Sequence, residues 1–452
     1  MFVPTVIDEE TPMRSSPRTT PPRRRLAASV ASAAIGLLAL TACSSGASSS
    51  DASDGRIHLT MYQQWGGGHE QAVLDRLIER YESLHPRVEI TETPVTNNAK
   101  ILASITGGDA PDIVDLGNSL PLGGWAAAGA LQPLDRYIRA SGLDTSTYIP
   151  SAMRAMTSNG KTYGLPFQVF TSGLIYNTKL LAEAGITKPP TTLQELATDA
   201  AKLTERNADG TITQMGFLPT YPGPDQGQTC PLISYGYAFG GGWTSSGGTA
   251  TPTRAANVAA LTWEQSFFKR YGVANVQNFI SSAGSYLTSG DPLESGKLAM
   301  MFDGPWSVQY ASDNRSAAAG DLRVVPLPAS STAPSRAGST YVDANAQVIP
   351  TGAEHPKAAF DFIKWETTNA SETASFSDTV GNIPQLKDTP SFALASDPQF
   401  AKYIGIAKSA NARSWTQTAT SSNYGTQLCE AQDNALLNGQ SATAALEAVT
   451  GR

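Results

Sequence analysis

The sequence predicts an α/β protein with two lobes. The first observation is a helix between two short strands near the start of the exported chain, which is a βαβ unit and implies a parallel sheet covered on both faces. The second is length. The chain has 452 residues, and if the first 42 are removed as a signal sequence, about 410 remain, which is more than one hydrophobic core usually holds. We therefore expect an α/β fold divided between two cores.

The first 42 residues have the pattern of an export signal. Arg23–Arg25 precede an apolar run, Leu26–Leu40, that is too short to span a bilayer comfortably. Leu40–Cys43 (Leu-Thr-Ala-Cys) resembles the bacterial lipobox, which implies that residues 1–42 are removed and that Cys43 becomes the lipidated first residue. An ordinary signal peptide with an incidental cysteine is the alternative, and both the Sec and the twin-arginine export routes stay open.

Residues 43–55 form a polar tether of small side chains, which we expect to be disordered. The net charge of −7 argues against a nucleic-acid partner, and no later apolar run approaches the length of a membrane helix. The prediction is an extracytoplasmic protein attached to the outer face of the cell membrane only through lipid at Cys43. Cys230 and Cys429 are candidate disulfide partners, but the sequence does not establish whether they are bridged.

The first secondary-structure elements follow from periodicity. Residues 57–61 alternate apolar and polar side chains and predict a strand. Residues 73–84 repeat apolar side chains at helical spacing until Pro86 stops the helix, and residues 88–91 alternate again. Together they make the βαβ unit.

The same alternation of elements continues along the chain. A short helix over 101–105 and a buried strand over 113–116 are predicted, followed by a helix over 125–131. Ligands of open α/β sheets lie outside the carboxyl ends of the strands. This rule marks Trp65, Asn118 and Gln168 as candidates for a ligand cleft.

Motifs along nearly the whole exported chain resemble those of one family. The matching segments are Gly108–Ile113, Gly129–Leu134, Tyr163–Pro166, Leu174–Leu180, Pro190–Leu196, Gly296–Met301 with Gly304–Trp306, Lys357–Ile363 and Gly381–Pro384. Each is weak alone, but their order resembles the bacterial extracellular solute-binding proteins of family 1, the maltose-binding-protein-like lipoproteins that feed carbohydrate ABC importers. The resemblance implies a two-lobe clamshell of the periplasmic-binding-protein type, with crossover hinge strands.

The resemblance also implies a domain map. Lobe one is expected to comprise residues 56–168 and 323–367, and lobe two residues 169–322 and 368–452. The solute would lie between the lobes. The loops 219–245 and 409–428, where the resemblance is poorest, would set the shape of the pocket.

A sugar exposes hydroxyls at its edge and apolar C–H groups on its faces, so its site needs aromatic surfaces and fixed polar groups. By resemblance, Trp306 stacks on a sugar ring from lobe two, with packing beneath its loop as the alternative. Asp303 is placed either to accept hydroxyl hydrogen bonds or to cap the helix that begins at Pro305.

The other candidates come from predicted loops and strand ends. Trp65 lies in a glycine-rich loop, where it either contacts solute or packs on the neighbouring helix. For the rest, packing or turn capping is the alternative to solute binding; they are Asn118, Gln168, Trp243, Tyr341, Asp343, Asn345 and Trp415. We expect Asp112, at the mouth of a strand, to close a turn.

No enzyme, metal site or cofactor is predicted. The chain has no Gly-x-Ser-x-Gly nucleophile elbow, its carboxylates form no recognisable acid/base motif, and its four histidines are scattered. The prediction is a monomeric receptor that captures a sugar or oligosaccharide and delivers it to ABC permease subunits. A surface glycan-binding lipoprotein without a transport role is the alternative function, and a polyol phosphate or small peptide is the alternative solute.

Overall fold

The computed structural model describes residues 55–66, 68–220, 230–245, 247–390 and 392–451. The expected signal peptide, Cys43 and all but the last residue of the tether lie outside this range. So does the stretch 221–229 of one pocket-shaping loop. Across the described ranges, no helix is long and apolar enough to cross a membrane.

Lobe one is built on a mixed sheet in which β1 pairs in parallel with both β2 and β3, which confirms the predicted βαβ unit. β12 is antiparallel to β3 and β6 and extends the sheet to β13. The strands are β1 (Ile57–Gln63), β2 (Val88–Pro94), β3 (Ile113–Leu116), β6 (Gly164–Thr171), β12 (Thr340–Val348) and β13 (Ala412–Arg413), with a small separate hairpin of β4 (Thr157–Ser158) and β5 (Lys161–Thr162).

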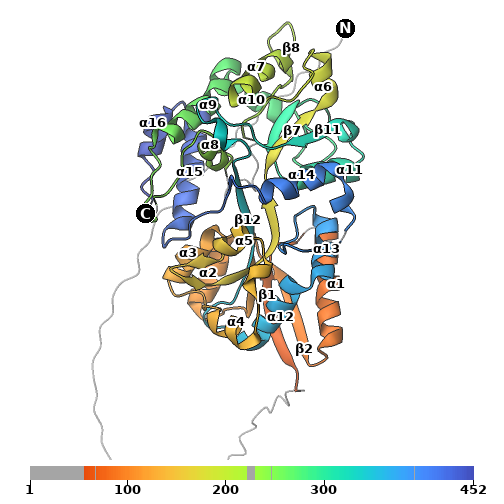
Figure 1. The fold of residues 1–452 in the computed structure, drawn as a ribbon, viewed down its shortest axis with the longest axis vertical. Coiled ribbons are helices and arrows are strands. Elements are labelled where there is room, and N and C mark those ends of the chain that lie inside the picture. The colour runs from red at the N-terminus through yellow and green to blue at the C-terminus, as the bar shows by residue number, and fades with distance from the viewer. Residues whose placement is uncertain (1–54, 67, 221–229, 246, 391, 452) are drawn as a thin grey trace, which may run out of the picture. The chain divides into compact units, whose positions relative to one another are not determined.

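Helices cover this sheet, and α1 shows how an apolar stripe faces it. Leu74, Leu77 and Ile78 of α1 are buried, at the spacing that the sequence predicted. The helices of lobe one are α1 (Gly68–Leu84), α2 (Asn98–Gly107), α3 (Leu120–Ala127), α4 (Asp135–Ser141), α5 (Pro150–Ala155), α12 (Pro356–Thr368) and α13 (Ala370–Val380) (Figure 1).

The helix predicted over 125–131 is wrong in its bounds. α3 starts earlier because Leu120 and Leu122 are already buried. It ends before Gly129, whose φ of 73° is left-handed. Leu131 instead bridges Pro350 beside the sheet.

Lobe two has a smaller sheet, in which β7 (Gly173–Asn177) lies between β10 (Met300–Asp303) and β11 (Leu322–Val325), antiparallel to both. Thr192 and Glu195 form a capping box at the start of α7, the helix expected after Pro190. The other elements are α6 (Thr178–Glu183), α7 (Leu193–Leu203), β8 (Glu205–Arg206), β9 (Ile212–Gln214), α8 (Leu232–Ala238), α9 (Ala255–Tyr271), α10 (Val273–Ser281), α11 (Pro305–Asp313), α14 (Pro398–Ala407), α15 (Ser421–Leu436) and α16 (Ala442–Glu447).

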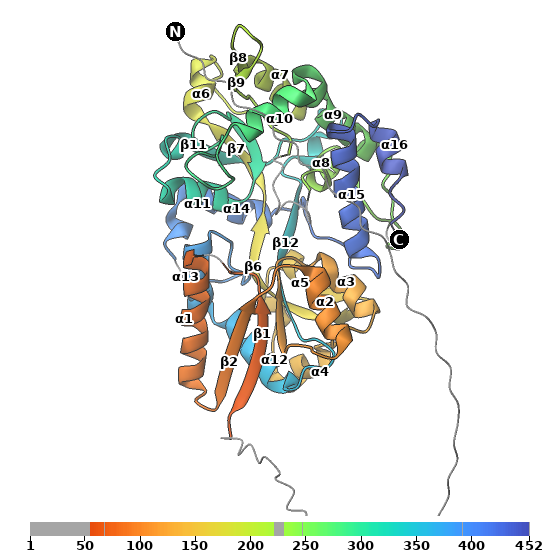
Figure 2. The same cartoon turned by 180° about the vertical axis from the view of Figure 1, so that it is seen from behind.

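The antiparallel strands β6 and β12 run from one lobe to the other (Figures 1 and 2). Their register shifts between Ala344 and Asn345, and Gln168, opposite this shift, has a φ of 52°. A bulge with a left-handed residue bends a strand. Where the chain passes between the lobes near Gln168, the paired strands β6 and β12 are therefore locally distorted.

Two of the expected lobe boundaries shift. β11 pairs with β7 of the second sheet, so residues 322–325 belong to lobe two and the chain returns to lobe one in β12. α13 packs against α1, so residues 370–380 stay with lobe one (Figure 1).

Gly216→Ala should destabilise lobe two, because an added Cβ would lie 2.1 Å from the carbonyl oxygen of Ala200 and 2.6 Å from its Cα. We expect a loss of about 1–3 kcal/mol in the free energy of unfolding, measured by chemical denaturation. The matched control is Gly405→Ala within α14, where a Cβ meets nothing within 4 Å. It should leave stability unchanged or raise it by about 0.5–1 kcal/mol. Equal effects of the two substitutions would contradict this packing.

Candidate functional site

A cavity of about 1310 Å³ lies between the lobes and is lined by both. Among the predicted site residues, the lining includes Trp65, Asn118, Asp303, Trp306, Tyr341 and Asn345. It thus combines aromatic rings with amide and acid groups, as expected for a carbohydrate site. These six predictions fall at one place in the fold.

The lobe-one wall carries Trp65, whose indole Nε1 donates a hydrogen bond to Asp115 Oδ2 at 2.6 Å. The ring meets Phe376 of α13 edge-on, with 5.1 Å between ring centroids. A short bond to an acid and an edge-on aromatic contact fix both the position and the tilt of the ring. Trp65 therefore lines the cavity as a rigid surface.

Asp115 itself is buried at the end of β3, and this burial raises its pKa to about 7. Its Oδ1 has no hydrogen-bond partner among the described residues. Glu366 of α12 is buried too, its pKa is raised by burial and then by repulsion from Asp115, and neither of its carboxyl oxygens has a partner in the described ranges. The low-dielectric setting favours the neutral form of both acids.

The lobe-two wall carries Trp306, in the first turn of α11. Its Nε1 donates to the hydroxyl of Tyr286 at 2.7 Å, and that hydroxyl donates to Asp303 Oδ2 at 2.7 Å. Burial raises the pKa of Asp303 to about 6. An added Cβ at Gly304 would lie 2.3 Å from the Trp306 ring, so the ring requires a glycine there.

Asp303 is therefore an anchor for an aromatic wall. Ser307 also donates to its Oδ2, and Gly304, not Asp303, is the N-cap of α11. The two roles predicted for Asp303, hydroxyl acceptor and helix cap, leave out this relay through Tyr286. Sequence reasoning missed Tyr286 because residues 282–299 have no periodic pattern that would place it.

Tyr341 repeats the arrangement on β12. Its hydroxyl donates to Asp343 Oδ2, and the backbone N–H of Ser119 donates to the same oxygen at 3.1 Å. Asp343 is fully buried, and this burial raises its pKa. Trp65, Trp306 and Tyr341 are thus each connected to a buried carboxyl group.

A hydrogen bond crosses the cavity from one lobe to the other. The hydroxyl of Tyr310 on α11 donates to Glu70 Oε1 on α1 at 3.1 Å. Both residues line the cavity. This bond depends on the relative position of the lobes, so it is a contact that opening of the cleft would break.

The structure corrects two predicted contacts near the crossover. Gln168 is fully buried and outside the cavity lining; its Oε1 accepts from Ser377 at 2.8 Å, and its backbone N–H donates to Gln385. Asp343 is also outside the lining: its Oδ2 accepts from Tyr341 and Ser119, and its Oδ1 accepts from the backbone N–H of Ala344. Both side chains fix the framework behind the site.

Two predicted tryptophans are corrected for a different reason. Trp243 fills space left by Gly236, where an added Cβ would lie 2.4 Å from the indole, and its Nε1 donates to Ile233 O at 3.0 Å. Trp415 is buried against Tyr424, with ring centroids 5.4 Å apart. Neither ring lines the cavity.

Two smaller predictions concern Asp112 and the cysteines. Asp112 accepts from the backbone N–H groups of Thr60 and His355, at 3.0 and 2.7 Å. It therefore ties β1 to the residue before α12, and the expected turn-closing role is wrong. Cys230 and Cys429 are buried free thiols in the structure. Cys230 also lines the cavity.

Asp115→Asn should stabilise the protein increasingly as the pH rises from about 4 to about 7. Because the pKa of Asp115 is raised in the folded state, its carboxyl group contributes to the free energy of unfolding while it is protonated, and this contribution is lost as it ionises. Asparagine stays neutral at every pH and can still accept the hydrogen bond from Trp65. Thermal unfolding of the wild type and the variant at each pH measures the difference in stability between them. Asp144→Asn, at an exposed turn where hydrogen bonds from Ser146 lower the acid's pKa, is the control and should show no such gain. A gap independent of pH would contradict burial of an ionisable Asp115.

Comparisons with known proteins agree with this geometry. Residues 66–373 match the model of the bacterial extracellular solute-binding protein family. A maltotriose-binding protein of Pyrococcus abyssi is 27% identical over 332 residues, 71% of this chain and 65% of that protein, and the maltodextrin-binding protein MdxE of Bacillus subtilis is 25% identical over 60% of each chain. The chain thus spans less than two thirds of the length of these two relatives.

Among solved structures, CpMnBP1 with mannotriose bound superimposes with a TM-score of 0.77 at 29% identity, covering 87% of this chain and 99% of that one. The match supports the two-lobe fold over nearly the whole described range. The family match and the structural match both indicate a solute-binding protein with two lobes. The chain belongs to the bacterial extracellular solute-binding protein family.

Proposed function

We propose that this protein is the sugar-binding component of an ABC importer and captures an oligosaccharide between its lobes. The observation that carries the proposal is the pair of anchored tryptophans, Trp65 from lobe one and Trp306 from lobe two, on the walls of one cavity. Flat rings fit the apolar faces of sugars, and Asn118 and Asn345 offer amide groups to hydroxyls.

The size of the cavity favours an oligosaccharide over a single sugar. Its 1310 Å³ exceeds the range of roughly 300–1,000 Å³ typical of small-molecule sites. The names of the similar proteins refer to maltotriose, maltodextrin and mannotriose. Mannotriose and maltotriose are therefore the first ligands to test.

Binding is coupled to closure of the lobes. A ligand that contacts both walls favours the closed state by its difference in affinity between the two states. The Tyr310–Glu70 bond between α11 and α1 would add to the closed state only. Permease subunits would then recognise the closed form, which makes the ligand the signal for docking.

The lipobox-like sequence supports attachment of a monomeric receptor to the membrane through lipid at Cys43, after removal of residues 1–42. The lipid would keep the receptor beside the permease at the outer face of the membrane. We propose no catalytic step, because Asp115, Asp303 and Asp343 each accept a hydrogen bond from an aromatic side chain and are thereby engaged in holding it.

Calorimetric titration and thermal-shift assays with mannotriose, maltotriose, glycerol phosphate and a tripeptide test the proposal. A saccharide should raise the melting temperature by mass action and bind with a dissociation constant near micromolar, equivalent to about 8 kcal/mol. Binding of the phosphate or the peptide alone would overturn the sugar assignment. Loss of sugar uptake on gene deletion would distinguish transport from glycan attachment.

Trp306→Ala should weaken saccharide binding at least about tenfold, because one stacked ring contributes on the order of 1–3 kcal/mol. Calorimetry of the folded variant gives the change. Trp365→Ala is the matched control: Trp365 packs on Tyr81 and Phe362 outside the cavity, so its loss should lower stability and leave affinity unchanged. Unchanged affinity in folded Trp306→Ala would remove this ring from the site.

A further inference from the structure

We propose that Cys230 and Cys429 form a disulfide bond once the protein reaches an oxidising compartment. The two residues are far apart in the sequence but belong to packed elements of the same lobe. Cys230 lies two residues before α8, and Cys429 lies within α15, which contacts α8. Disulfides persist outside the cytoplasm, where an exported receptor works.

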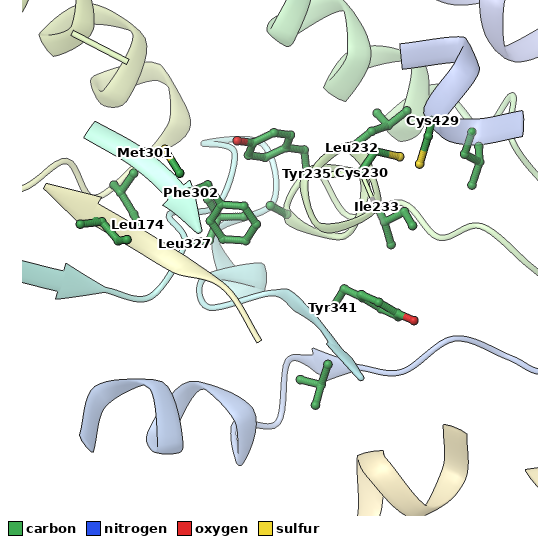
Figure 3. Packing of buried hydrophobic residues seen from close by; sticks show 14 of the residues in the cluster. Leu174, Cys230, Leu232, Ile233, Tyr235, Met301, Phe302, Leu327, Tyr341 and Cys429 are labelled. Carbon is green, nitrogen blue, oxygen red and sulfur yellow. The ribbon is translucent and has the colours of Figure 1, made fainter. Parts of the chain in front are cut away.

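The geometry of the two side chains supports the bond. Figure 3 shows the sulfur atoms of Cys230 and Cys429 pointing toward one another between the two helices. Both side chains are buried, with exposed fractions of 7% and 8%. Burial first, and then a hydrogen bond with Cys429, raises the pKa of the Cys230 thiol. The two thiols are reduced in the structure and lie next to each other, so oxidation can link them by a disulfide bond.

The oxidant in the proposed step is another disulfide, either of an oxidoreductase or of a small thiol. One protein thiol loses its proton and attacks a sulfur of the oxidant, which releases one thiol and leaves a mixed disulfide. The second protein thiol, also deprotonated, displaces the remaining half. The protein loses two protons and two electrons in all, and the oxidant takes them up and leaves as two thiols. Because burial disfavours the thiolate, the exchange should be slow at neutral pH.

The bond would fasten one wall of the cavity. Cys230 lines the cavity, and Ser234 Oγ on α8 accepts the backbone N–H of Tyr341 at 3.0 Å. Trp243 donates to Ile233 O on the same helix. A covalent link from the start of α8 to α15 therefore ties this wall to the C-terminal helices, and it closes a long loop that restricts the unfolded chain.

The test uses the full chain with Cys43→Ser, so that Cys230 and Cys429 are the only cysteines left of three. The protein is incubated with glutathione disulfide at mildly alkaline pH, unfolded without reductant, treated with iodoacetamide, digested and analysed by mass spectrometry. Neither cysteine should be alkylated, and their two peptides should appear joined. After prior reduction both should be alkylated. Reduction should also lower the melting temperature by on the order of 5 °C.

The double variant Cys230→Ser/Cys429→Ser is the control, and its melting temperature should not respond to reductant. Alkylation of both cysteines after oxidation would overturn the proposal, as would a separate glutathione adduct on each. The labelling result depends only on the native pair, so it stands even if the double variant folds poorly. It also involves no sugar, so its failure leaves the proposed function untouched.

Discussion

The site depends on one repeated interaction, in which a polar hydrogen of an aromatic side chain is bound to a buried carboxyl group. Trp65 donates directly to Asp115, and Trp306 reaches Asp303 through Tyr286. Fixing the orientation of an aromatic ring before the ligand arrives reduces the entropy lost on binding. The acids thus determine where the flat surfaces lie.

These anchors involve a cost in stability. Burial raises the pKa of Asp115 to about 7 and that of Asp303 to about 6, which means that the fold disfavours their charged forms. A core of apolar residues would avoid this penalty. The proposed function explains this cost: if the lobes open and close around a ligand, the rings must keep their orientation in both states, and the acids would supply that fixed orientation.

The sequence predicted the parts of the fold that depend on local pattern. The βαβ unit is confirmed because residues 57–91 carry strand and helix periods that nothing further along the chain overrides. The lobe boundaries shifted because they depend on pairing between strands that are distant in the sequence. The sequence of β11 predicts a short strand but does not show that its partner is β7 of lobe two. Gln168 lies at the bulge in the crossover ribbon, but its side chain is bonded to Ser377 and Thr373 of α13 and is absent from the cavity lining.

The site was predictable only in part, for a physical reason. A tryptophan next to glycines can line a cavity or fill the space that a glycine leaves. Trp65 and Trp306 do the first, whereas Trp243 fills the space beside Gly236. The difference lies in contacts between segments far apart in sequence. Tyr286, which completes the anchor of Trp306, lies in a segment without regular periodicity, so no sequence signal marks it.

The most direct measurement is a crystal structure of the protein with mannotriose or maltotriose bound. This account predicts sugar rings against Trp65 on one side and Trp306 on the other, with their indole N–H groups still bound to Asp115 and Tyr286. A saccharide seated elsewhere, or rings that leave their acid partners to meet it, would contradict the central claim.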